Sequence, residues 1–187
     1  VIPRIGPFMA KLTIPRPAAG EYAPYHATYV AMVPDGDVLM TLKKQHGETL
    51  RMLSRLGEKK SRLRYAPGKW SIREVIGHLI DAERVFTYRA LTFARGDRTQ
   101  LPGFDENMWA SASNAESRTL KSLLEELKAV RSATLTLFRG FNDDQLARTG
   151  VASGHQVSVR GLVFVTAGHE RHHVRILRER YFAKTQR

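Results

Sequence analysis

Segment 168–173, with the sequence GHERHH, contains the residues best suited to metal chemistry. His169 and His173 are four positions apart, so on a helix they lie about one turn apart and roughly 40° apart around the axis. At that spacing both imidazoles can reach the same ion. The pair therefore predicts two ligands of a metal site.

The run from His169 to His173 also matches H-E-x-x-H, the metalloprotease helix in which the glutamate is the general base. The additional histidine and glycine of the extended metzincin pattern do not follow it. We therefore discount the protease interpretation and look for a third ligand elsewhere in the chain. Glu170 points roughly 100° away from His169 on a helix, which favours a place at the surface or between helices over a role as base.

His78 is the strongest candidate for the third ligand. It lies in a segment whose apolar residues recur at helical spacing, on the same side as Val75 and Ala82. An imidazole on an apolar face requires a polar partner or a metal. Glu74, one turn earlier, either accepts the second ring hydrogen of His78 or completes a capping box with Ser71, and the sequence leaves both interpretations open.

The other histidines are weaker candidates for metal ligands. His46 is expected on the inward side of the first helix, as a wall of the same cavity and not as a fourth ligand. His172 falls at the edge of the inward face and is expected at the surface or in support of a ligand. His26 and His155 receive no role. Two aromatic residues could wall the pocket, although packing is the commoner role at a helix start: Tyr65 and Trp70.

Helical periodicity indicates the elements that must position these residues. It predicts four long helices at about 38–56, 71–94, 117–138 and 158–181, and one or two further turns at 141–148 capped by Asn142. The long connection at 95–116 indicates a crossover and not a simple up-and-down order. No convincing strand pattern is present. Four amphipathic helices predict an all-α protein with a four-helix bundle fold.

Two regions are expected along the chain. Residues 1–35 contain six of the eight prolines, which remove amide donors and disfavour helix, so we predict an extended N-terminal arm. Residues 36–187 are predicted to form the bundle. At 187 residues the chain fits one domain with such an arm.

Composition narrows the classes of function. The absence of cysteine excludes thiolate metal sites, disulfides and a cysteine nucleophile. No apolar run is long enough to cross a membrane, and we expect a cytoplasmic protein without a membrane partner. The net charge of +12 raises nucleic acid as a partner, but the basic residues are scattered and no known binding motif accompanies them. We therefore expect no specific nucleic-acid binding.

Several motifs together resemble the DinB superfamily, also called the DinB/YfiT-like metalloenzymes. They are APGKWS at 66–71, Glu74 and His78 followed by DAER at 81–84, and GHERHH at 168–173; LPGFDEN at 101–107 is similar to one subgroup. The resemblance extends from about residue 29 to 181. It implies a four-helix bundle, often a homodimer, with one divalent metal held by His78, His169 and His173.

Three neutral imidazoles leave an open coordination position, which is typical of a catalytic site. Such ligands suit zinc or nickel first, and also iron or copper. We expect a small-molecule substrate and either hydrolysis or transfer of a low-molecular-weight thiol, a reaction that some related families catalyse. The alternative is a nucleic-acid-binding protein connected with damage or stress, in which the metal is structural.

Overall fold

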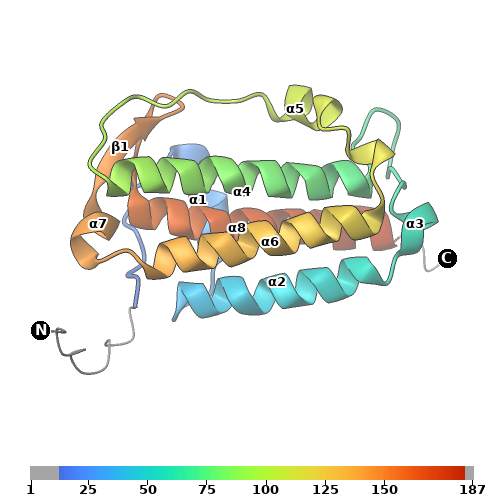
Figure 1. Ribbon diagram of the computed structural model, residues 1–187, viewed down its shortest axis with the longest axis horizontal. Helices are drawn as coiled ribbons and strands as arrows, with labels where there is room; N and C mark the ends of the chain where they lie inside the picture. Colours follow the sequence, from blue (N-terminus) through green and yellow to red (C-terminus); the bar gives the residue numbers. More distant parts are fainter. Residues whose placement is uncertain (1–12, 184–187) are drawn as a thin grey trace, which may run out of the picture.

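The computed structural model describes residues 13–183, which form a four-helix bundle with smaller elements at its ends and along one side (Figure 1). The four long helices are α2 (Val38–Ser54), α4 (Ile72–Ala94), α6 (Leu120–Arg139) and α8 (Val159–Ile176). Helix α4 packs against α6 and α8, and α2 packs against the same two helices. Helices α2 and α4 therefore lie diagonally across the bundle, as do α6 and α8. The four-helix bundle predicted from the sequence is confirmed.

The direction of the helices confirms the predicted crossover. Helix α4 ends at one end of the bundle, and the connection that follows runs back along α4 to the other end, where α6 begins (Figure 1). Helices α4 and α6 therefore run in the same direction, and α2 and α8 run in the opposite one. This connection contains α5 (Glu106–Ala112) and a 3-10 turn, η2 (Ala115–Ser117), which the sequence analysis did not predict.

Side-chain caps define where the long helices begin. Asp37 accepts hydrogen bonds from two amides of α2, and Ser158 accepts one from Gly161 in α8. Ser71 and Glu74 form the predicted capping box of α4, which satisfies amides that the first helical turn leaves free. Helix α6 begins later than expected, because residues up to Ser117 form η2 and Thr119 is the cap.

Short elements close the ends of the bundle. Helix α3 (Gly57–Lys60) follows α2, and α7 (Asp143–Ala147) follows α6 with the predicted Asn142 cap. After α8 the chain continues as a π-helical segment, η3 (Leu177–Phe182). An antiparallel hairpin of β1 (Thr149–Ala152) and β2 (His155–Ser158) precedes α8. The hairpin is an addition to the predicted all-α fold, and four-residue strands are too short to show a sequence pattern.

The predicted extended arm is partly helical, so that prediction is wrong at its C-terminal part. Residues Pro24–His26 form a 3-10 turn, η1, and Ala27–Ala31 form α1, which packs on α8. Proline at the first position of a helical turn loses no hydrogen bond, and Pro24 occupies such a position. Residues 1–12 lie outside the described part of the chain, and the division into arm and bundle stays a prediction.

The apolar core has two clusters separated by a layer of polar side chains. One cluster lies toward the hairpin, around Phe93 and Phe138, and the other lies toward α3, around Ile76 and Leu123. Between them α2, α4, α6 and α8 contribute buried polar residues that include the predicted ligands. No helix within residues 13–183 is long and apolar enough to cross a membrane.

Candidate metal centre

Three histidines from two helices meet on one side of the bundle. His78 comes from α4, and His169 and His173 come from α8. One nitrogen of each ring lies within 4.8 Å of the other two. His78 Nε2 and His169 Nε2 are 3.0 Å apart, although 91 positions separate the two residues. The structure therefore brings together the three residues that the sequence predicts as ligands.

Close approach of α1 to α8 sets the surroundings of the triad. A Cβ on Gly168 would overlap the carbonyl oxygen of Tyr29, so only glycine allows this approach. The Tyr29 ring then lies 5.5 Å from the His169 ring, and the Trp70 ring lies 4.8 Å from the His78 ring. Aromatic rings thus restrict the orientation of two of the three imidazoles. Trp70 also lines the cavity, so of the two interpretations left open for it the structure supports the pocket wall.

Burial keeps the triad neutral. It lowers the pKa of His78 to about 4, and together with the neighbouring histidines it holds the pKa values of His169 and His173 well below 6.5. Within residues 13–183, none of the three imidazoles forms an ion pair with a carboxylate. Neutral imidazole is the form that binds a metal, so these rings are ready to act as ligands at neutral pH.

The arrangement fits a transition-metal ion. Ligand atoms about 2.0–2.1 Å from a tetrahedral ion are roughly 3.3 Å from one another. The ring nitrogens of the triad therefore need only small side-chain shifts to bind one ion. Three imidazoles leave a fourth position open, and the triad lines a cavity of about 530 Å³ that can deliver a ligand to it.

Glu170 does not face this cavity. Its Oε2 accepts hydrogen bonds from Arg131 Nη1 at 2.8 Å and from Gln45 Nε2 at 2.5 Å, and Arg131 also pairs with Glu83. These side chains join α2, α4, α6 and α8 in the polar layer. The place between helices expected for Glu170 is confirmed, and its neighbour His46 lies 4.0 Å from it. The prediction that His46 lines the triad cavity is therefore wrong.

Two other residues that the sequence nominated, Glu74 and Tyr65, have structural roles. Glu74 completes the capping box and forms an ion pair with Arg64 at 2.6 Å, so the capping interpretation is the one the structure supports. Tyr65 packs edge-on against Tyr181, with ring centroids 5.0 Å apart, and does not line the triad cavity. His172 lines the cavity as a half-buried neighbour of the triad, in agreement with a supporting role.

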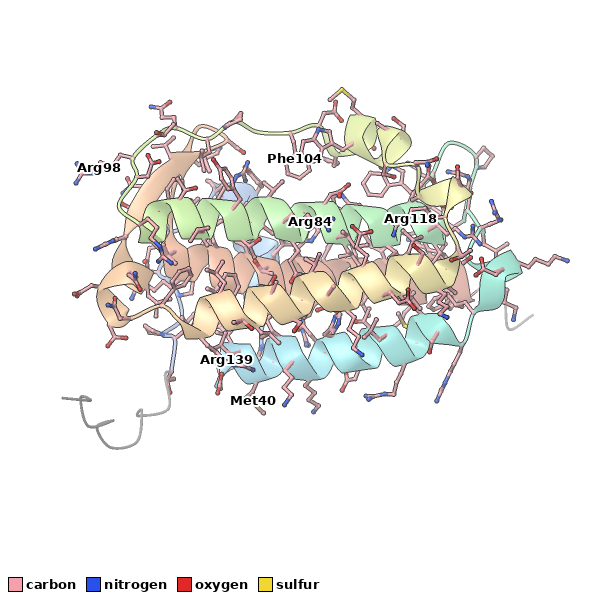
Figure 2. All side chains as sticks on the ribbon, viewed as in Figure 1. Met40, Arg84, Arg98, Phe104, Arg118 and Arg139 are labelled. Carbon is pink, nitrogen blue, oxygen red and sulfur yellow. The ribbon has the colours of Figure 1, made fainter. Side chains whose placement is uncertain are left out.

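Sequence analysis missed much of the cavity wall. His26 is buried in η1, and Arg89 and Phe86 come from α4. Phe104 and Glu106 come from the long connection, where Phe104 lies over α4 (Figure 2). Arg89 does share the inward face of its helix with His78, which was the available signal. Phe86 lies on the same periodic helix, whereas His26, Phe104 and Glu106 belong to segments without periodicity.

Comparison with known proteins agrees with this fold. A family model described as the DinB superfamily matches residues 41–177, which include His78, His169 and His173. The fold and the site define a class of protein: a helical bundle with a cavity that is lined by histidines from two of its helices. The chain belongs to the DinB superfamily.

Individual relatives are more distant. A protein of Oceanobacillus iheyensis named "putative metal-dependent hydrolase" is 26% identical over 136 residues, which cover 72% of this chain and 76% of the relative. A solved structure, YfiT from Bacillus subtilis, is 17% identical and superposes with a TM-score of 0.67 over 86% of this chain and 92% of YfiT. That structure is described as "a probable metal-dependent hydrolase with an unusual four-helix bundle topology". At this identity, the likeness to YfiT shows the shared fold.

Proposed function

We propose that this protein is a metal-dependent hydrolase that acts on a small molecule, with His78, His169 and His173 as the ligands of one divalent ion. The observation that carries the proposal is the convergence of three buried, neutral imidazoles on a cavity. A structural metal is normally enclosed by four protein ligands, whereas a catalytic one keeps a position for water or substrate. The names of the relatives support the same reaction class.

The ion would supply Lewis acidity and a lowered pKa of bound water, which gives a nucleophile near neutral pH. The chain's own residues would do the rest. His78, His169 and His173 hold the ion on rigid helices, and the rings of Tyr29 and Trp70 restrict access of bulk water. His172 lines the same cavity while remaining half-buried, so its ring can exchange a proton between solvent and substrate.

Zinc and nickel are the proposed ions, with iron as a further possibility, because all accept imidazole ligands. Transfer of a low-molecular-weight thiol is a second proposed reaction, since the open position could also bind a thiolate. A homodimer is likewise part of the proposal. The alternative of a nucleic-acid-binding protein with a structural metal fits less well, because the ligands line a cavity and do not enclose the ion.

The test is a reconstitution assay. Protein stripped of metal would be reloaded separately with zinc, nickel or iron(II) and assayed on chromogenic esters and amides, with and without a low-molecular-weight thiol. We expect hydrolysis that depends on the ion and is lost in His169→Ala but retained in the matched control His155→Ala. Turnover only with the thiol would favour the transferase, and salt-sensitive DNA binding retained by His169→Ala would favour the alternative.

A further inference from the structure

Arg89 is a buried cation in the wall of the triad cavity. The residue is only 4% exposed. Its Nη2 donates hydrogen bonds to the Pro102 carbonyl oxygen at 2.7 Å and to Ser153 Oγ at 2.9 Å. Both acceptors are neutral. Within residues 13–183, Arg89 forms no ion pair with a carboxylate. A buried charge normally has an opposite charge beside it, and for Arg89 the described residues supply none.

Half of the guanidinium group is available to such a partner. The guanidinium has five N–H donors, and the two bonds above both come from Nη2. Nη1 and Nε therefore have no hydrogen-bond acceptor in the described part of the chain. Because Pro102 and Ser153 hold Nη2, the planar group is fixed in orientation. The N–H groups of Nη1 and Nε remain for charge-assisted hydrogen bonds to an anion.

The charge of the cavity favours an anion. The imidazoles of the triad are neutral, so a bound divalent ion would keep its positive charge, and Arg89 adds another. Glu106 is the carboxylate that lines the cavity, but it is an exposed residue and forms no ion pair with Arg89. The cavity is therefore positive overall once an ion is bound, which attracts anionic small molecules.

We propose that Arg89 is a specificity-determining residue that binds an oxyanion of the substrate, a carboxylate or a phosphate, while another part of the substrate reaches the metal centre. This inference rests on the proposed metal-dependent function. A fixed guanidinium with free N–H groups binds either oxyanion through charge-assisted hydrogen bonds, and its charge would distinguish both from a neutral amide. The substrate class is thus a small anionic ester or amide.

Three matched ligands test the proposal by their affinity. Each has a hydroxamate to bind the metal and a short chain that ends in a carboxylate, a phosphonate or a primary amide. Titration calorimetry with zinc-loaded protein would compare them in the wild type, Arg89→Gln and Arg89→Lys. Arg84→Gln is the matched control, because Arg84 lies on the same helix with its side chain half exposed and paired with Glu126 (Figure 2).

We expect the wild type to bind one of the two anionic ligands about 10- to 100-fold more tightly than the amide. Which anion is preferred identifies the oxyanion. Arg89→Gln should lose this preference while its affinity for the amide stays within about threefold, and Arg89→Lys should keep part of it because a lysine retains the charge without the planar fork. Arg84→Gln should behave as the wild type.

Three results would overturn the proposal. Equal affinity for all three ligands in the wild type would show that no oxyanion site exists, although the metal centre would stand. If Arg89→Gln and Arg89→Lys bind all three ligands more weakly by the same factor, Arg89 only holds the long connection and the hairpin in place. If no hydroxamate binds to the wild type, the metal centre fails and this inference fails with it.

Discussion

Glu170 and Arg131 form an ion pair of 2.8 Å in the interior of the bundle, on the side of α8 that faces α2 and α6. Glu170 directly follows His169, so adjacent residues of one helix serve different sites. The imidazole lines the cavity, and the carboxylate joins the polar layer. Arg131 and Gln45 hold the pKa of the Glu170 carboxyl below its usual value, although burial acts in the opposite direction. Glu170 is therefore an ionised structural residue, unlike the base of a metalloprotease.

Replacement of this carboxylate tests that assignment. Glu170→Gln keeps the shape of the side chain but loses the charged hydrogen bond to Arg131, which still has Glu83. We expect the free energy of unfolding to fall by about 1–3 kcal/mol. The bound metal and the turnover number should stay near the wild-type values. Loss of a general base would instead lower turnover by about 10²-fold or more with little change in stability, which denaturant titration and kinetics would reveal.

Gly168 and Gly47 provide a matched pair of helical glycines. A Cβ at Gly168 overlaps the Tyr29 carbonyl oxygen, whereas a Cβ at Gly47 meets only the mobile end of Arg51, at 3.7 Å. We expect Gly168→Ala to destabilise the protein by about 1–3 kcal/mol, because α1 must move. Gly47→Ala should stabilise it by up to about 1 kcal/mol through helix propensity.

Thermal unfolding of both variants would check this pair. Displacement of α1 should also alter the cavity, so Gly168→Ala should bind metal-directed ligands more weakly than Gly47→Ala does. Unchanged stability of Gly168→Ala would show that α1 is not held against α8 in solution.

The metal-free protein should lose stability as the pH falls from about 6.5 to about 4. Burial lowers the pKa of both His26 and His78 to about 4 in the folded state, whereas an unfolded histidine has a pKa near 6.5. Between these values the unfolded state binds more protons, so the free energy of unfolding rises with pH, by about 1.4 kcal/mol per pH unit for each group.

His26→Phe should reduce that slope by the contribution of one group, while stability above pH 7 should depend little on pH in both proteins. Urea titrations at half-unit pH intervals would measure the slopes. An identical slope in His26→Phe and the wild type would show that His26 is not buried as described.

Much of the architecture was predictable because it depends on local rules. Spacing placed His78, His169 and His173 on inward helix faces, and the caps at Ser71, Asn142 and Ser158 marked helix starts. The ligand triad followed because helix periodicity determines which face each histidine occupies.

Features that depend on long-range packing were not predictable. His46 shares an inward face with core leucines, yet the diagonal placement of α2 and α4 turns that face toward Glu170 and away from the cavity. His26 and Arg89 acquire their roles only because α1 and the long connection fold over α4 and α8. Their sequence spacing carries no information about those contacts.

The measurement that tests the central claim most directly is elemental analysis of protein purified without a histidine tag. We expect about one zinc, nickel or iron ion per chain in the wild type and in His155→Ala, and only traces in His78→Ala, His169→Ala and His173→Ala. Circular dichroism would confirm that each variant is folded. A wild type that holds no metal and takes up none of these ions when they are added would contradict the claim, as would undiminished metal in the triad variants.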